Sequence, residues 1–298
     1  MIPKSLNLKT IVIGSAILMV IFGCSESFDQ DSQSKIVGGK NDEISFPAVA
    51  ELGIEDKYAN DNWRSFCTGT FVSSDLFLTA AHCITGIDSY IKAYNMPKKL
   101  FVRSPILENK ISSEIVILAP DSDKLQDKNG RRVPEYRYTD LAFIKFAANT
   151  IPSNLIAKIA TQEPTKGEDV TLIGYGHDTF DTEYYMHTGG GVRRVGKSKF
   201  NGYLDEEMKT TINVAGIVST KSLEKHPDLG ASTLPGDSGG PLFNAKGEII
   251  GILSSGYDYD DINYSLYVNV NFQKSRDFID CVLKSNEDKT SCSAPKGE

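Results

Sequence analysis

The stretch LPGDSGGPLF, residues 234–243, places a serine between an aspartate and two glycines, directly before an apolar run. Serine is a poor nucleophile near neutral pH, so it needs a base within hydrogen-bond reach and a third group that orients the base. The stretch is therefore either a polar turn that leads into a sheet or the site of a reactive serine, Ser238. The second interpretation requires that the rest of the chain supplies the partners.

The bulk composition is that of a globular protein large enough to bury a core. The chain has 298 residues, of which 40% are hydrophobic and 24% are charged, close to the averages for folded domains. The formal net charge of −7 disfavours nucleic acid and anionic membrane surfaces as partners. We expect a monomer.

The N-terminus has the features of an export signal. A short basic start precedes an apolar run at residues 11–23, which is shorter than the roughly 20 residues that a membrane span needs. We expect residues 1–23 to be a signal peptide and residues 24–35 a polar linker. The run ends in IFGC, which resembles the lipobox of bacterial lipoproteins and implies lipidation of Cys24. The alternative is ordinary signal peptidase cleavage nearby, with Cys24 incidental.

Cysteine usage agrees with export. Without Cys24, four cysteines remain, and an even number in an exported protein indicates two disulfides. Four cysteines allow three connectivities, and sequence proximity favours Cys67–Cys83 and Cys281–Cys292. Closing loops of this size contributes about 3 kcal/mol on the chain-entropy argument.

From residue 36 onward, short apolar or alternating runs such as FCTGTFV, LFLTAA and LAFIKF are separated by polar turns. This texture is typical of an all-β sandwich or barrel. Residues 148–168, which contain prolines and a glycine, are predicted to link two halves. Apolar residues at helical spacing predict a C-terminal helix at about 272–284, followed by a tail at 285–298. Polar loops such as DSDKLQDKNGRR, residues 121–132, are expected to be solvent-exposed insertions without a role.

The chain contains four histidines, and one of them has a distinctive context. His82 lies in LTAAHC, at the end of an apolar run and beside Cys83, where a disulfide would hold it rigidly. The other three, His177, His187 and His226, lie in polar, loop-like segments. A lone histidine is more often structural than catalytic, but the combination of LTAAHC with GDSGGP favours a base and a nucleophile.

Together these motifs resemble the trypsin/chymotrypsin family of serine proteases. LTAAHC matches the family's histidine segment, YTDLA at 138–142 its aspartate segment, and GDSGGP its nucleophile segment, in the family's order. KIVGG at 35–39 matches the activation site, and GYG at 174–176 matches a strand that usually carries Trp. The resemblance extends from residue 36 to about residue 283, and it implies an enzyme that acts on proteins or peptides.

The resemblance implies an all-β fold of two six-stranded antiparallel β-barrels and a C-terminal α-helix. The protease domain would cover residues 36–284, with a first barrel at about 36–150 and a second at about 165–270. His82 and Asp140 would come from the first barrel and Ser238 from the second, with the active site in the cleft between them.

The resemblance also implies the roles of these residues, which are those of the Ser-His-Asp triad known from this family. Ser238 would attack the scissile carbonyl, His82 would transfer the proton, and Asp140 would orient the imidazole. The N–H groups of Gly236 and Ser238 would form the oxyanion hole. Ser254 matches a family serine that contacts the aspartate.

Activation would follow cleavage between Lys35 and Ile36 by an activating protease. In the family's scheme the freed Ile36 amine pairs with Asp237 in a buried site, and breaking such a pair costs about 3–5 kcal/mol. The alternative is that Lys35 is a chance basic residue before a strand. If Cys24 carries lipid, the same cleavage would release the enzyme from its membrane tether.

Primary specificity is expected to depend on Ser232 at the base of the pocket, with Gly256 and Ser265 on its walls. Leu234 stands where many relatives have a bridging cysteine. This set favours a neutral, apolar side chain before the scissile bond, so another protease would have to cut after lysine. The alternative is an Asp of the acidic loop at 258–261 that selects Lys or Arg.

No metal or other cofactor is expected. Residues 103–120 lack a clear carboxylate pattern for the calcium that many relatives bind, and the chain lacks phosphate-loop and zinc-ligand spacings. Two further functions stay open. The chain could be a proteolytically inactive binding module, although all three triad residues are present, or a surface lipoprotein that acts as an adhesin.

Overall fold

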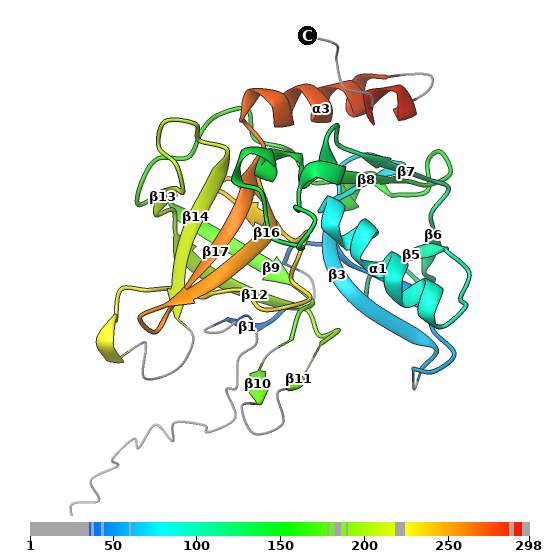
Figure 1. Cartoon of the computed structure of the whole chain (residues 1–298), viewed down its shortest axis with the longest axis horizontal. Helices are drawn as coiled ribbons and strands as arrows, with labels where there is room; N and C mark the ends of the chain where they lie inside the picture. Colours follow the sequence, from blue (N-terminus) through cyan, green and yellow to red (C-terminus); the bar gives the residue numbers. More distant parts are fainter. Residues whose placement is uncertain are drawn as a thin grey trace, which may run out of the picture. The chain divides into compact units, whose positions relative to one another are not determined.

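The structure, a computed structural model, contains two curled antiparallel sheets and a C-terminal helix (Figure 1). The described residues are 36, 39–42, 45–59, 61–177, 179–181, 186–188, 190–217, 224–285 and 289–293. The predicted signal peptide, Cys24 and Lys35 lie outside them. Within the described ranges, none of the helices is long and apolar enough to cross a membrane.

The first sheet has seven strands in the order β6-β5-β2-β3-β4-β8-β7. Its strands are β2 (Val49–Glu55), β3 (Trp63–Phe71), β4 (Leu76–Thr79), β5 (Leu100–Arg103), β6 (Ile111–Ser112), β7 (Ile115–Leu118) and β8 (Ala142–Lys145). Helix α1 (Ala81–Ala93) follows β4. Two 3-10 turns, η1 (Ser122–Lys124) and η2 (Pro134–Thr139), lie in the long connection that precedes β8.

The second sheet has eight strands in the order β1-β12-β9-β15-β16-β17-β14-β13. Its strands are β1 (Lys40–Asn41), β9 (Asp169–Gly174), β12 (Arg194–Lys199), β13 (Gly202–Tyr203), β14 (Thr211–Ile217), β15 (Pro241–Phe243), β16 (Ile249–Tyr259) and β17 (Ile262–Asn269). Strands β10 (Thr179–Asp181) and β11 (Met186–Thr188) form a separate pair. The turn η3 (Ser153–Leu155) lies between the two large sheets in sequence.

The two antiparallel sheets and the helix confirm the predicted fold class, with two differences in detail. Short strands such as β6 and β13, two residues each, extend the sheets beyond six strands. Strand β1 belongs by number to the range expected for the first barrel, but it pairs with β12 of the second sheet. Because this pairing is between residues far apart in sequence, local patterns could not predict it.

Contacts between aromatic rings stabilise the first sheet. Phe71, Phe77 and Phe146 are each fully buried, and their ring centroids lie 5.2 to 6.5 Å apart. Burying one such side chain contributes about 1.5–3 kcal/mol. Gly69 makes this packing feasible, because a Cβ there would meet the Phe77 ring at 2.4 Å.

Helix α3 (Gln273–Lys284) packs on the first sheet after the last strand (Figure 1). Its buried residues include Phe278, whose ring lies 5.6 Å from that of Phe143 in β8. The Cys281–Cys292 disulfide joins α3 to the turn η4 (Lys289–Ser293). The helix therefore supports the strand that directly follows Asp140.

Candidate active site

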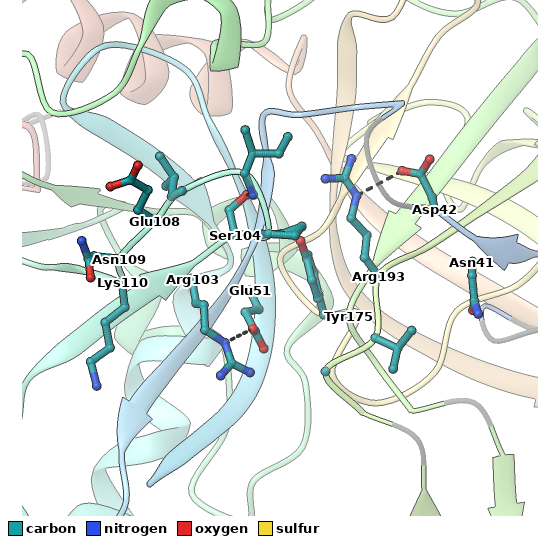
Figure 2. Close-up of a pocket in the computed structure, with 15 residues that line it drawn as sticks. Asn41, Asp42, Glu51, Arg103, Ser104, Glu108, Asn109, Lys110, Tyr175 and Arg193 are labelled. Carbon is teal, nitrogen blue, oxygen red and sulfur yellow. Dashed lines mark hydrogen bonds and ion pairs between the residues drawn. The ribbon is translucent and has the colours of Figure 1, made fainter. Parts of the chain in front are cut away.

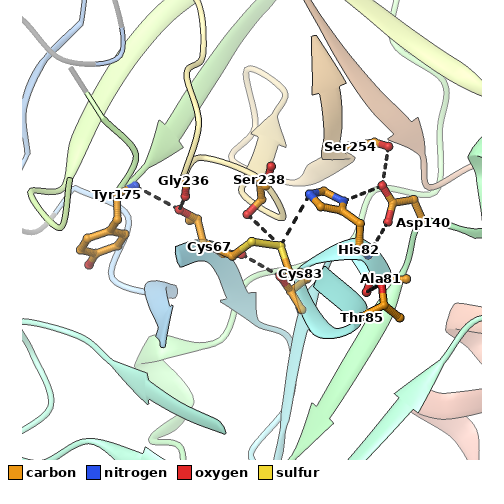
Figure 3. Close-up of a disulfide and its surroundings, with 12 residues drawn as sticks. Cys67, Ala81, His82, Cys83, Thr85, Asp140, Tyr175, Gly236, Ser238 and Ser254 are labelled. Atoms are coloured by element: carbon orange, nitrogen blue, oxygen red, sulfur yellow. Dashed lines mark hydrogen bonds and ion pairs between the residues drawn. A yellow bond between two sulfur atoms is a disulfide. The ribbon is translucent and has the colours of Figure 1, made fainter. Parts of the chain in front are cut away.

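His82 lies in the first turn of α1, directly after β4. Its backbone N–H donates to Asp140 Oδ1 at 2.8 Å, and its Nδ1 pairs with Asp140 Oδ2 at 2.8 Å. The neighbouring Cys83 is joined to Cys67 of β3, the pair that sequence proximity favours. Both the start of the helix and the imidazole are thus fixed to one carboxylate (Figure 3). The sequence led us to expect a rigid loop here, whereas the structure has a helix.

Asp140 follows the turn η2 and is fully buried. Besides His82, its Oδ2 accepts hydrogen bonds from Ser254 Oγ at 2.5 Å and Arg132 Nη1 at 2.7 Å. Burial alone would raise the pKa of the Asp140 carboxyl. The charges and hydrogen bonds of His82, Arg132 and Ser254 outweigh that effect and hold this pKa well below its ordinary value. Asp140 is therefore ionised at neutral pH.

Ser238 sits in a tight turn before β15, on the Nε2 side of the His82 ring, while Asp140 lies on the Nδ1 side (Figure 3). Gly239, which follows it, has φ +79°. A Cβ at Gly239 would meet Thr79 Oγ1 at 2.1 Å, so only glycine lets the turn approach the first sheet this closely. The backbone of Thr68 in β3 donates to the Ser238 carbonyl at 2.8 Å and fixes the turn to that sheet.

The peptide groups around Ser238 leave two donors available. Thr68 Oγ1 donates to the Gly236 carbonyl at 3.0 Å and accepts from the Tyr175 N–H at 3.0 Å. Among the residues that the structure describes, none accepts a hydrogen bond from the N–H of Gly236 or Ser238. Such paired free donors beside a nucleophile can stabilise a developing oxyanion.

Asp237 is the second buried carboxylate of this turn. Its Oδ1 accepts from the Gly176 N–H at 2.8 Å and its Oδ2 from the Leu234 N–H at 2.9 Å. Burial raises the pKa of Asp237 to about 6, although these two N–H groups and the charge of Arg194 act in the opposite direction. Ile36, the first residue after the expected cleavage site, is also buried, at 1% exposure.

Arg132 contacts the His82–Asp140 pair, and sequence reasoning assigned its loop no role. Besides Asp140, Nη1 of Arg132 donates to Ser254 Oγ at 3.0 Å, and Nη2 donates to the Ser254 carbonyl at 2.9 Å. The expectation that the whole 121–132 loop is a solvent-exposed insertion is therefore wrong at this residue. An arginine in a polar loop has no local sequence signal that distinguishes this position from the exposed Arg131.

The residues expected to form the specificity pocket lie around buried hydroxyl groups. Ser232 and Ser265 are fully buried, and Gly256 of β16 is the register partner of Ser265 in β17. Ser265 Oγ lies 2.8 Å from Thr233 Oγ1 and donates to Asn263 Oδ1 at 3.0 Å. The groups that meet here are neutral.

The acidic loop lies at the tip of the β16–β17 hairpin. Asp258 is exposed and accepts from Asn263 Nδ2 at 2.8 Å, and Asp261 forms an ion pair with Lys225. Asp260 is exposed at the turn itself, with φ +50°. Asn263 thus connects Asp258 to the hydroxyl groups of the pocket, while Asp261 is paired elsewhere.

One group of potential metal ligands occurs in the described residues, and it lies at this site. Single ligand atoms of Cys67, His82 and Cys83 lie within 4.8 Å of one another. Both cysteine sulfurs are joined in a disulfide, so neither offers a thiolate to a metal. The geometry therefore belongs to the disulfide beside His82.

A pocket of about 710 Å³ is lined by residues of β1, β2 and β5, with Tyr175 in its wall (Figure 2). Its buried charges are paired internally. Glu51 accepts from Arg103 Nε at 2.5 Å, and Arg193 Nε lies 3.1 Å from Asp42 Oδ2. The pocket therefore has no single-sign charge that would attract an ion.

Comparison with known proteins agrees with this geometry. The sequence pattern of the trypsin family matches residues 36–279, most of the chain. The chain belongs to the trypsin family. Brachyurin from Leptuca pugilator is 28% identical over 218 residues, which cover 71% of this chain and 82% of brachyurin. The trypsin-family chain is thus a chymotrypsin-like serine peptidase.

Solved structures agree on the fold of this trypsin-family chain. Neuropsin, a serine protease expressed in the limbic system of mouse brain, matches with a TM-score of 0.55 and 21% identity over 78% of this chain and 94% of neuropsin. The structure of HBP matches with a TM-score of 0.56 and 16% identity over 83% of this chain and 96% of HBP. At these identities the likeness concerns the fold alone.

Proposed function

We propose that the peptidase is an endopeptidase whose catalytic residues are Ser238, His82 and Asp140. The observation that carries this proposal is the pair of hydrogen bonds between His82 and Asp140. One involves Nδ1 and the other the backbone N–H of His82, and each is 2.8 Å long. This arrangement selects the tautomer in which Nδ1 carries the proton and Nε2, on the side of Ser238, accepts one.

In the proposed reaction, Ser238 Oγ attacks the scissile carbonyl carbon while its proton passes to His82 Nε2. The N–H groups of Gly236 and Ser238 stabilise the negative oxygen of the tetrahedral intermediate. The carbon–nitrogen bond then breaks, and His82 gives the proton to the leaving amine. Water attacks the acyl-enzyme, losing a proton to His82, and Ser238 regains its hydroxyl proton as the acid product leaves. Asp140 stays ionised throughout, in keeping with its lowered pKa.

We further propose that the chain is a zymogen activated by cleavage between Lys35 and Ile36. The new Ile36 ammonium would pair with Asp237 and lock the turn that carries Ser238. Support comes from the burial of both residues and from the raised pKa of Asp237, which is what a carboxyl lacking a close cation shows. A Lys35→Gln chain, assayed before and after treatment with a lysine-specific protease, should stay at the precursor's low activity.

The pocket chemistry supports specificity for neutral, apolar side chains before the scissile bond. Ser232, Thr233 and Ser265 bring hydroxyl groups and no charge. The rival preference for Lys or Arg would require an Asp of the acidic loop at 258–261. Asp258 is linked to the pocket through Asn263 but is itself exposed. With a neutral pocket, the cut after Lys35 needs another protease.

We propose export, with a lipid tether at Cys24 that activation removes. Members of the trypsin family are typically secreted. The four remaining cysteines form two disulfides within the protease domain, so no disulfide would retain the linker after cleavage. Finding the Ile36-started chain in detergent-extracted membranes, and not in the soluble fraction, would contradict this release.

A cleavage profile tests the proposed function. A chain that begins at a free Ile36 and its Ser238→Ala variant would be incubated with a mixed peptide library, and the products read by mass spectrometry. We expect cuts after Phe, Tyr or Leu that the variant does not make. Cuts after Lys or Arg would instead favour the acidic loop and permit self-activation. No cuts by the folded chain would favour a binding module, which Ser238→Ala should leave active.

A further inference from the structure

Arg132 reaches the site from a loop in which the residues directly before it are exposed. Its neighbours Asn129 to Arg131 are exposed, whereas the Arg132 side chain is only 22% exposed. Its guanidinium bridges the two halves of the site, because it binds Asp140, next to β8 of the first sheet, and Ser254 in β16 of the second. Arginine suits this task, since its planar fork can hold several acceptors at once.

With the hydrogen bond from Arg132, one carboxylate oxygen of Asp140 has three donors. Oδ2 lies 2.8 Å from His82 Nδ1, 2.5 Å from Ser254 Oγ and 2.7 Å from Arg132 Nη1. A carboxylate oxygen offers about two lone-pair sites, so the three donors compete. The Arg132 charge also offsets the negative charge with which Asp140 would stabilise a protonated imidazole. Arg132 in this position therefore weakens the action of Asp140 on His82.

The second contact occupies a backbone acceptor. Ser254 lies at a bulge of β16, where the pairing with β17 shifts between Leu253 and Ser255. Its carbonyl faces the partly exposed guanidinium of Arg132 at 2.9 Å. Strand β15 pairs with β16 only as far as Ile252, so the part of β16 beyond it is not covered by β15. An extended peptide that adds to an uncovered strand edge binds through such carbonyls. A peptide lying along β16 toward Ser238 would need the carbonyl that Arg132 holds.

We infer that Arg132 is a displaceable latch that makes the peptidase selective for extended substrates. This inference rests on the proposed triad. In the resting enzyme the guanidinium holds the Ser254 carbonyl and shares Asp140 Oδ2. An extended peptide displaces it from that carbonyl and returns Asp140 to His82. A short substrate that does not reach β16 leaves Arg132 in place and reacts slowly.

The test compares Arg132→Ala with Arg131→Ala, which removes the same charge from the same loop at an exposed position. Each chain would be made full-length and activated by cleavage after Lys35. It would then be assayed on a single-residue ester and on a hexapeptide with the same residue before the cut. Arg132→Ala should raise kcat on the ester about tenfold and change kcat on the hexapeptide less than threefold. Arg131→Ala should change neither.

Arg132→Lys tests the geometry of the contact. A lysine keeps the charge but lacks the fork that holds Asp140 and Ser254 together, so its ester kcat should lie between those of the wild type and Arg132→Ala. An ester kcat that is unchanged or lowered in Arg132→Ala would overturn the latch. If Arg132→Ala does not fold, Arg132→Gln takes its place and is judged by the same criterion.

Labelling of Ser238 with a fluorophosphonate separates this inference from the proposed function. Labelling should be lost in Ser238→Ala and equal in amount among the other chains. The labelled amount gives the concentration of active enzyme from which each kcat is calculated. If the wild type shows no Ser238-dependent labelling, the proposed function fails and the latch with it. Normal labelling with unchanged ester kinetics in Arg132→Ala overturns the latch alone.

Discussion

Two buried carboxylates lie at the turn that carries Ser238, and their pKa values are shifted in opposite directions from the ordinary value. Asp140 is surrounded by His82, Arg132 and Ser254, and its pKa lies well below the ordinary value. Asp237 has two backbone N–H groups and the more distant charge of Arg194, and its pKa rises to about 6. Burial acts alike on both, so the difference comes from the neighbours that each carboxylate contacts.

The comparison separates two uses of a buried charge. Asp140 contacts His82 through two hydrogen bonds in the folded chain, as its proposed role in orienting a base requires. Within the described residues, Asp237 has no cation in direct contact, in keeping with a proposed partner that appears only after cleavage at Ile36. The predictions that follow alter one carboxylate at a time.

The largest effect is expected for Asp140→Asn. An amide at this position would favour the wrong tautomer of His82, and kcat should fall by about 10⁴-fold, a magnitude known for this family and not calculated from this structure. Peptide hydrolysis by the activated chain measures it. Asp169→Asn, which removes an exposed carboxylate paired with Lys199, should leave kcat unchanged. A loss of less than tenfold in Asp140→Asn would remove Asp140 from the triad.

Asp237→Asn should change how the stability of the uncleaved chain depends on pH. A carboxyl with a raised pKa binds more protons in the folded than in the unfolded chain between pH 3.8 and about 6. Its contribution is therefore fully favourable below pH 3.8 and is lost as the pH rises through 6. The cost at pH 7.5 is about 3 kcal/mol, and Asp237→Asn abolishes it.

Urea unfolding at pH 4 and pH 7.5, in a Ser238→Ala background that prevents self-digestion, measures this change. The substitution also alters the hydrogen bond from Leu234, but that loss is present at both pH values. The unfolding free energy of the variant relative to its parent should be about 3 kcal/mol more favourable at pH 7.5 than at pH 4. Equal effects at the two pH values would contradict the raised pKa.

Gly174→Ala disturbs Asp237 without changing a charge. The new Cβ would lie 2.0 Å from Asp237 Oδ1, and because the carboxylate is buried it cannot swing into solvent. We expect a loss of about 1–3 kcal/mol in unfolding free energy and slower fluorophosphonate labelling of Ser238. Gly86→Ala in α1 is the matched control. No atom lies within 4 Å of its Cβ position, and it should gain up to about 1 kcal/mol.

The smallest effect is expected for Ser254→Ala. Asp140 would keep both hydrogen bonds from His82, so a single donor is lost from Oδ2. This corresponds to about 1 kcal/mol, or a fivefold lower kcat on the hexapeptide. A loss beyond 100-fold would show that Ser254 contributes more to Asp140 than this one hydrogen bond.

Sequence reasoning succeeded where short motifs carry the information. GDSGGP needs a glycine after Ser238 because a Cβ at Gly239 would overlap the Thr79 hydroxyl, and such a requirement is visible in a few consecutive letters. The alternating apolar runs predicted the strands of the two sheets for the same reason. The cysteine pairs close short loops, so proximity was an adequate guide to Cys67–Cys83 and Cys281–Cys292.

It failed where the decisive contact joins distant segments. Arg132 contacts Ser254 across 122 positions, and no periodicity records that distance. Strand β1 pairs with β12 across an even longer separation. The helical position of His82 was missed because the short apolar run before it predicts a strand, and the first turn of α1 is fixed by the Asp140 carboxylate, far along the chain.

The hydrogen bonds of Thr68 determine when, during folding, the turn around Ser238 can form. This residue of the first sheet binds the carbonyls of Gly236 and Ser238 and the N–H of Tyr175, all from the second half of the chain. The reactive turn therefore takes its shape only once the two halves have docked. A chain whose second half has not yet docked contains both motifs but no assembled turn, so the proposed activity of Ser238 requires that the whole domain has folded.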